Sequence, residues 1–362
     1  MNKDLTSPHL FQPLTLKSIT LRNCIGVSPM CQYSSEDGVA TDWHLVHLGS
    51  RAVGGAGLVL AEATAVSAEG RITPGDAGIW AEKHIEPIAR INRFVKSQGA
   101  VPGIQIAHAG RKASAARPWE GGASLANNKG GWETIAPSSL AFGGELTKVP
   151  RAMTEADITK VQNEFVAAAK RALTAGAEFL ELHFAHGYLA HEFLSPISNR
   201  RSDKYGGSFE NRIRFAVETA HAVRAVWPDK FPLAARLSCT DWVDGGWDIE
   251  QSIELSRHLK TEGVDLIDCS SGAMTPDAKI PMGAGYQVPF AERIRREANI
   301  ATAAVGMITE PTHADEIIRN GRADLVLLAR EFLREPYWPR IAAQVLRQKN
   351  SLPTPVQYGR AW

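Results

Sequence analysis

The strongest constraint on the fold is a series of eight short apolar runs that recur along the whole chain. Each run ends in polar or Gly residues, and most are followed by a segment with helical periodicity. In chain order they read CIGVSPM, GLVLAEAT, PGIQIAH, FLELHFA, PLAARLS, VDLIDCS, ATAAVGM and ADLVLLAR. Eight strand–helix repeats predict an α/β protein with one (β/α)8 TIM-barrel domain over residues 1–362, rather than two domains.

Two of the intervening segments have clear helical signals. Residues 82–99 are amphipathic, and residues 154–176 begin with a capping-box pattern from Thr154 to Asp157 and end at Gly176. These signals predict helices that cover the outside of the barrel.

Two segments add to the regular plan. Residues 9–22 alternate between apolar and polar side chains, which predicts an N-terminal hairpin at the bottom of the barrel. Residues 109–153, after the third strand, are rich in Gly, Ala, Ser, Pro and Trp and are too long for an ordinary connection. We expect this insertion to act as a lid over the active face.

Charge and composition favour a small-molecule ligand. Forty Lys and Arg against 39 Asp and Glu give a net charge of +1, and no basic run indicates a nucleic-acid or membrane partner. The N-terminus lacks the apolar core of a signal peptide, and no apolar stretch is long enough to span a bilayer. Four cysteines without a C-x-x-C pair fit free thiols in a reducing compartment. We therefore expect a cytoplasmic protein.

Polar side chains gather where the strands end, which is where a (β/α)8 barrel places its working residues. Strand alternation turns Glu181 toward the barrel axis and the leucines beside it toward the helices. The ends of the first, third, fourth and fifth strands supply Cys31, Tyr33, Gln105, His108, His183, His186, Tyr188 and Arg236.

The same alternation points Arg236 inward, where a guanidinium needs an anionic partner. Two interpretations stay open from position alone. The partner is either a cofactor that becomes anionic or a buried carboxylate such as Glu181 or Glu62.

The histidine pair at the fourth strand allows three interpretations. Metal binding is disfavoured because the first strand ends without Asp or Glu and the chain has no H-x-H. A structural role is the usual alternative for either imidazole alone. We favour the third interpretation, in which His183 and His186 donate hydrogen bonds that polarise a carbonyl oxygen and Tyr188 donates a proton. The second pair, His44 and His47, is expected to pack or cap the first helix.

Nucleotide motifs are absent or misplaced. The glycines at 54, 55 and 57 precede a strand instead of following one, and no P-loop pattern exists. A phosphorylated cofactor would therefore be held by the loops after strands seven and eight, where AVGMIT and Arg330 stand. Cys31, beside Tyr33 at a strand end, is expected to contact such a cofactor.

Five segments carry a resemblance to a known family: SPMCQYS, HAGRKAS, RPWEG, HGYLAHEFLSPISNRRSDKYGGSFENR and PVQYGRAW. With them the chain resembles the Old Yellow Enzyme family of FMN-dependent ene-reductases, in its thermophilic-like class, from the first strand to the last residue. The resemblance implies NADPH-dependent reduction of activated C=C bonds in enones, enals and nitro compounds, by ping-pong hydride transfer through flavin N5. A metal-dependent hydrolase using His183 and His186 is the alternative, and a flavin binder without turnover is disfavoured.

Site roles follow from the resemblance residue by residue. His183 and His186 would hold the substrate oxygen, Tyr188 would donate the proton, Tyr33 would reach the substrate, and Cys31 would tune the flavin potential. The implied FMN contacts are Ser28, Pro29, Met30, Cys31, Ala63, Gln105, Arg236, Gly306, Ala329 and Arg330, with no metal.

Two features qualify the resemblance. The family usually has Gly-Arg where this sequence has Ala329-Arg330, and the added methyl matters only if that backbone needs a positive φ. The tail, residues 351–362, resembles tails whose arginine enters a neighbouring subunit's active site. This implies that Arg360 acts in trans within a homodimer or homotetramer. The cysteine spacing and length predict neither the iron–sulfur cluster nor the second nucleotide-binding domain of larger relatives.

Overall fold

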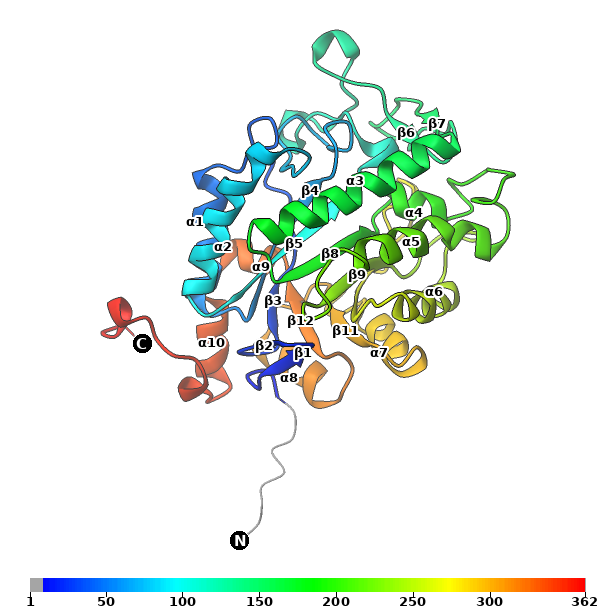
Figure 1. Ribbon diagram of the computed structural model, residues 1–362. Coiled ribbons are helices and arrows are strands. Elements are labelled where there is room, and N and C mark those ends of the chain that lie inside the picture. The colour runs from blue at the N-terminus through cyan, green and yellow to red at the C-terminus, as the bar shows by residue number, and fades with distance from the viewer. Residues whose placement is uncertain (1–8, 362) are drawn as a thin grey trace.

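The computed structural model describes residues 9–361, and its centre is a closed barrel of eight parallel strands (Figure 1). The strands pair in chain order, and the last closes on the first. They are β3 (Ile25–Val27), β4 (Leu58–Ala65), β5 (Val101–Ala107), β8 (Phe179–Phe184), β9 (Leu233–Ser238), β10 (Leu266–Ser270), β11 (Ala301–Ala304) and β12 (Leu325–Leu328). All eight predicted strands and the (β/α)8 fold are confirmed.

Helices surround the barrel (Figure 1). The capping box of the predicted third helix forms, since Thr154 Oγ1 accepts from Asp157 N at 3.1 Å and Asp157 Oδ2 accepts from Thr154 N at 2.8 Å. The helices are α1 (Asp42–Gly54), α2 (Ile85–Ser97), α3 (Glu155–Thr174), α4 (Leu189–Leu194), α5 (Phe209–Arg224), α6 (Ile249–Thr261), α7 (Val288–Glu297), α8 (Pro311–Arg319), α9 (Arg330–Arg334) and α10 (Trp338–Val345).

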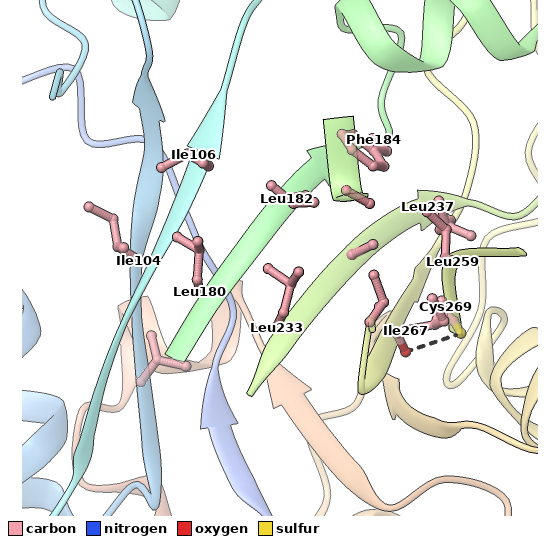
Figure 2. Packing of buried hydrophobic residues seen from close by; sticks show 14 of the residues in the cluster. Ile104, Ile106, Leu180, Leu182, Phe184, Leu233, Leu237, Leu259, Ile267 and Cys269 are labelled. Atoms are coloured by element: carbon pink, nitrogen blue, oxygen red, sulfur yellow. Dashed lines mark hydrogen bonds between the residues drawn. The ribbon is translucent and has the colours of Figure 1, made fainter. Parts of the chain in front are cut away.

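The main core lies between the strands and the helices. Figure 2 shows Ile104, Ile106, Leu180 and Leu182 projecting from β5 and β8 into this layer. Successive residues of a strand face opposite sides, so Gln105 and Glu181 face the barrel interior, where they bond to each other. The alternation predicted from the sequence is confirmed.

The hairpin predicted within residues 9–22 forms from β1 (Leu14–Leu16) and β2 (Ile19–Leu21), which pair antiparallel. Its apolar side chains pack against a buried cluster built largely from the first residues of the barrel strands, such as Leu58 and Phe179. The hairpin therefore covers the bottom of the barrel, as predicted.

The insertion at 109–153 lies at the opposite end of the barrel, at the top of Figure 1. It contains short 3-10 turns and the two-residue strands β6 (Ile135–Ala136) and β7 (Arg151–Ala152). Arg117 Nε donates to Tyr33 O at 3.1 Å, so the insertion contacts a predicted site residue. Its lid function stays a prediction.

Residues 1–8 and Trp362, which belong to the predicted domain and tail, lie outside the described residues. Within residues 9–361, no helix is long and apolar enough to cross a membrane.

Candidate active site

The end of β8 brings three predicted residues together. The ring centroids of His183 and His186 lie 5.1 Å apart, and those of His183 and Tyr188 lie 4.9 Å apart, both nearly perpendicular. His183 is the last residue but one of the strand, His186 lies in the turn that follows, and Tyr188 is the N-cap residue of α4. The first turn of chain beyond the strand therefore builds one compact cluster of rings.

Burial sets the protonation of this cluster. Desolvation, assisted by the charge of Arg236, holds the pKa of both His183 and His186 well below the ordinary histidine value. His183 Nδ1 accepts from Ala185 N at 3.3 Å, which leaves the proton of the neutral ring on Nε2. Burial also raises the pKa of Tyr188 well above 10, so its hydroxyl keeps its proton. The cluster offers neutral hydrogen-bond donors and a phenol proton.

A cavity of about 340 Å³ adjoins the cluster and runs across the ends of the later strands. Five residues predicted from the sequence line it: His186, Arg236, Gly306, Ala329 and Arg330. Other lining residues were not predicted from the sequence, among them Ser270, Ser271, Tyr286, Gln287, Thr309 and Arg334. The two serines could have been predicted, because Ser270 ends the sixth strand and Ser271 follows it.

Arg236 forms a buried ion pair with Asp268, with 3.0 Å between Nε and Oδ2. The partner is a buried carboxylate, but it is neither of the two that the sequence suggested. Glu181 accepts a hydrogen bond from Gln105, and Glu62 lies 3.1 Å from His44. Arg236 also lines the cavity, and its contact with a cofactor that becomes anionic stays a prediction.

The first helix confirms the capping role expected of His44. Its Nδ1 accepts from Thr41 N at 2.9 Å, and its Nε2 lies 3.1 Å from Glu62 Oε1. His47 is buried on the same helix, and desolvation lowers its pKa to about 3.

The end of the first strand carries Cys31 and Tyr33. Burial first, and then the carboxylates of Asp76 and Glu62, raise the pKa of the Cys31 thiol well above its ordinary value. Cys31 therefore stays a neutral thiol, and it lies in contact with the Tyr33 hydroxyl.

Two observations bear on the remaining residues predicted to bind a cofactor. Ser28 Oγ is buried without a hydrogen-bond partner among the described residues. Ala329 has a φ of −105°, so this position does not need the positive φ that favours glycine. Pro29 and Met30 follow Ser28, and Ala63 lies within β4 beside Gln105 of β5.

Arg360 is an exposed residue of the segment after α10, and it does not line the cavity of its own chain. Its action in a neighbouring subunit stays a prediction.

Two chemical classes were considered for the site. Among residues 9–361, no group of three or more His, Cys, Asp and Glu side chains is placed to hold a metal ion, so the hydrolase alternative has no support. The residues in and near the cavity at the strand ends fit a flavin mononucleotide better. Ser28 offers an unpaired buried hydroxyl, Arg236 and His186 offer donors, and Arg330 and Arg334 offer positive charge for a phosphate.

Comparison with known proteins shows the family to which the chain belongs. Residues 9–349 match the model of the NADH:flavin oxidoreductase / NADH oxidase family. The chain is 50% identical over 355 residues to the NADPH dehydrogenase of Geobacillus sp. (strain WCH70), covering 98% of each chain. It is 48% identical over 355 residues to the NADPH dehydrogenase of Bacillus subtilis (strain 168), covering 98% of this chain and 99% of that one.

Solved structures with the same architecture include morphinone reductase, with a TM-score of 0.79 and 26% identity over 95% of this chain and 91% of that chain. A 2-naphthoyl-CoA reductase complexed with 2-naphthoyl-CoA has a TM-score of 0.85 and 25% identity, over 94% of this chain. This chain spans about half the length of that reductase, 52% of it.

Proposed function

The chain belongs to the NADH:flavin oxidoreductase / NADH oxidase family, and from this premise we propose that it is an NADPH-dependent ene-reductase. It is an FMN-dependent oxidoreductase, as the resemblance to the Old Yellow Enzyme family implied. We propose as substrates the enones, enals and nitro compounds whose C=C bond is activated by a neighbouring oxygen-bearing group. NADPH is the proposed hydride donor, because the most similar relatives bear the name NADPH dehydrogenase.

The observation that carries this proposal is the cluster of His183, His186 and Tyr188 beside the cavity. Two neutral imidazoles can donate to a carbonyl or nitro oxygen and stabilise the negative charge that develops there. A phenol that keeps its proton at neutral pH is suited to protonate the α-carbon of the substrate. A hydrolase has no use for this combination without a metal or a nucleophile.

The cofactor is proposed to lie in the same cavity. Ser28, Gln105, Arg236, Gly306, Ala329 and Arg330 are proposed to hold it, together with Pro29, Met30, Cys31 and Ala63. FMN bound there would supply two-electron hydride chemistry, taking electrons from NADPH and giving them to the alkene. Arg236 keeps a fixed positive charge at the cavity wall, although Asp268 neutralises part of it.

The two reductions are proposed to use one pocket in turn, which gives ping-pong kinetics. His183 donates through Nε2, His186 supports the same oxygen, and Tyr33 lies on the substrate side. Arg360 of a second copy completes the pocket in a cytoplasmic homodimer or homotetramer. A protein that sediments as a monomer and still reduces the alkene as fast as the oligomer contradicts the proposed role of Arg360.

Replacing Tyr188 by Phe tests the proton-donor assignment. Tyr188→Phe should slow alkene reduction by about 10²- to 10⁴-fold, because a positioned acid contributes about that much. Flavin reduction by NADPH should change little, because that step needs no proton from Tyr188. Stopped-flow absorbance separates the two half-reactions.

The matched control is Tyr205→Phe, which removes a phenolic oxygen that bonds Glu218 outside the cavity. It should leave both half-reactions near the wild-type rates. Equal loss of both half-reactions in Tyr188→Phe contradicts the assignment.

A further inference from the structure

The turn that carries the proposed catalytic residues has an unusual backbone. His186 has a φ of 61° and Gly187 a φ of 69°, so two consecutive residues occupy the left-handed region. For a non-glycine residue this conformation is strained and persists only where the surrounding structure holds it. The geometry of His186 and Tyr188 therefore depends on contacts made to the turn itself.

Three side chains from different parts of the chain bond to the backbone of this turn. Ser238 Oγ, at the end of β9, accepts from His186 N at 2.9 Å. Lys112 Nζ, in the insertion, donates to His186 O at 2.9 Å. His191 Nδ1, on α4, accepts from Gly187 N at 2.9 Å. Every one of these contacts fixes a backbone atom of the left-handed pair.

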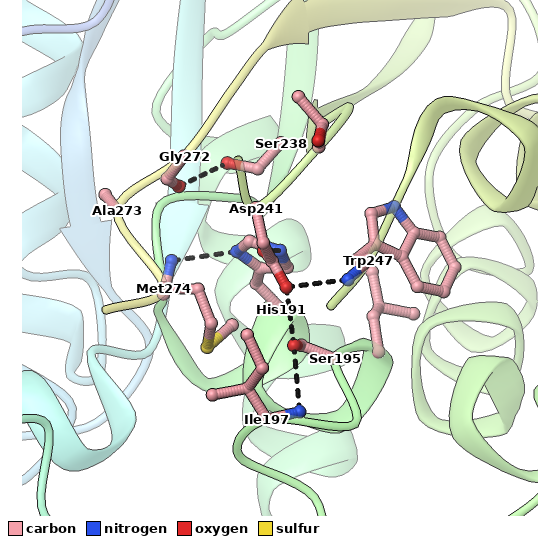
Figure 3. A network of polar contacts seen from close by, with 12 residues as sticks. His191, Ser195, Ile197, Ser238, Asp241, Trp247, Gly272, Ala273 and Met274 are labelled. Carbon is pink, nitrogen blue, oxygen red and sulfur yellow. Dashed lines mark hydrogen bonds and ion pairs between the residues drawn. The ribbon is translucent and has the colours of Figure 1, made fainter. Parts of the chain in front are cut away.

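The contact made by His191 requires one tautomer. Because Nδ1 accepts a hydrogen bond from Gly187 N, it carries no hydrogen, and the ring hydrogen must be on Nε2. Nε2 lies 3.0 Å from Asp241 Oδ1, and both side chains are fully buried. Figure 3 shows the imidazole of His191 beside the Asp241 carboxylate. The carboxylate therefore stabilises the tautomer that the turn needs.

Two further hydrogen bonds hold the Asp241 carboxylate in place. Its Oδ2 accepts from Ser195 Oγ at 2.6 Å and from Trp247 N at 2.8 Å (Figure 3). Ser195 bonds the carboxylate rather than the imidazole, so these residues do not form the nucleophile–base pair of a hydrolase. Neither His191 nor Asp241 lines the cavity. The hydrogen bond from Gly187 N to His191 joins the pair to the turn that carries the site residues.

We propose that His191 and Asp241 are a positioning pair that holds the turn carrying His186 and Tyr188 in its reactive geometry. The inference rests on the proposed ene-reductase function, and it assigns to this buried pair a role in the alkene-reducing half-reaction. Outer partners of metal-binding histidines change metal affinity or activity by 10- to 100-fold when they are mutated, and we expect an effect of about that size for this pair.

Asp241→Asn tests the role of the tautomer with almost no change in shape. Trp247 N is a fixed donor, so the amide oxygen must face it and the amide NH2 must face His191 Nε2. The amide NH2 and the Nε2 hydrogen of His191 are then both donors. Either the imidazole hydrogen moves to Nδ1, where it opposes Gly187 N–H, or the imidazole loses its contact with residue 241. We expect alkene reduction at saturating substrate to fall about 10- to 100-fold.

Long-range ¹⁵N NMR of the holoenzyme reads the tautomer without any turnover. The expected wild-type signature is an unprotonated Nδ1 and a protonated Nε2 on His191. A wild-type Nδ1 that carries the hydrogen overturns the proposal whatever the activity is. A wild-type enzyme that reduces no alkene contradicts the proposed function instead, and leaves the tautomer result to decide on the pair.

Two further comparisons guard against a variant that simply unfolds. His191→Asn keeps an oxygen acceptor near the position of Nδ1, whereas His191→Leu keeps none. The Asn variant should therefore reduce the alkene at least several-fold faster than the Leu variant. Equal rates in the two variants overturn the proposal. The matched control is Glu262→Gln, which alters the exposed His221–Glu262 pair, 2.7 Å long, and should leave the rate unchanged. A wild-type rate in a folded Asp241→Asn variant also overturns it.

Discussion

Burial, rather than residue type, gives the site residues their chemical character. His183 is 3% exposed, and desolvation keeps its imidazole neutral, so it acts as a directed hydrogen-bond donor instead of a cation. The same desolvation keeps Tyr188 protonated. A site with neutral donors binds an uncharged carbonyl weakly and an oxygen with developing charge more strongly, which is the difference that catalysis requires.

Replacing His183 by Ala tests its donor role. His183→Ala should weaken the binding of phenolate-forming ligands such as 4-hydroxybenzaldehyde about 10-fold or more, because a hydrogen bond to a charged oxygen is worth about 1.5–3 kcal/mol. Spectroscopic titration of the flavin band measures the dissociation constant. His221→Ala, at an exposed histidine, is the control. An unchanged affinity in His183→Ala excludes the oxyanion role.

The buried Glu192 provides a pH test. Burial raises its pKa from the ordinary value of 4.5 to about 8, against the opposing charge of Arg111. The unfolded carboxyl loses its proton near pH 4.5, whereas the folded one holds it to about pH 8. The stabilisation is therefore complete below pH 4.5 and is lost as the pH rises through 8.

Glu192→Gln removes this dependence while keeping an oxygen that accepts from Arg111 N, a contact of 2.8 Å in the wild type. The melting temperature of the variant should rise relative to that of the wild type from pH 5 to about pH 8 and change little beyond it. Thermal unfolding at five pH values measures this, with the exposed Glu254→Gln as control. A difference that stays constant with pH contradicts the assignment.

The sequence shows which strand residues point into the barrel, but it does not show which of them pair with each other. Alternation alone placed Gln105, Glu181 and Arg236 inside the barrel. The partner of Arg236 was missed because it depends on the register between two strands, which sets Arg236 opposite Asp268. Register is fixed by packing across the whole barrel and has no signal within either strand.

At the scale of elements, the turn after β8 is the most constrained part of the site. A Cβ atom on Gly187 would lie 2.2 Å from Ala273 O, so this turn touches the loop after β10. Gly207 also has a positive φ, of 82°, but a Cβ there would meet nothing within 4 Å. Substitution of Gly207 therefore tests backbone strain alone, whereas substitution of Gly187 tests strain and steric crowding together.

We expect Gly207→Ala to destabilise the protein by about 1–2 kcal/mol, the cost of the left-handed conformation alone. Gly187→Ala should lose about 1–3 kcal/mol more through overpacking, and it should slow alkene reduction because His186 and Tyr188 move. Denaturant unfolding and stopped-flow rates measure the two effects. Equal destabilisation in the two variants would show that the contact with Ala273 does not constrain the turn.

Elements with regular periodicity were predicted well from the sequence, and the irregular ones were not. The eight strands, the hairpin and the capping box of α3 all follow from local patterns. The internal structure of residues 109–153 does not, because its conformation is set by side chains that reach distant loops. Lys112, which bonds the turn after β8, is such a contact.

At the scale of the whole molecule, the cavity lies where the ends of neighbouring barrel strands converge. Its walls come from the ends of β8 to β12 and the segments after them, which lie side by side in the barrel although they are spread over the chain from residue 186 to residue 334. The proposed site residues therefore come together only in the folded barrel. The sequence predicted five of the lining residues, and most of the others come from the segments after β10 and β11.

The central claim is that this barrel holds FMN and passes electrons from NADPH to an activated alkene. The most direct measurement is the visible spectrum of the purified protein without oxygen, recorded before and after adding NADPH and then 2-cyclohexenone. The account predicts flavin absorbance that bleaches with NADPH and returns with the enone. A protein that stays colourless after incubation with FMN, or a bleached flavin that the enone fails to reoxidise, would contradict it.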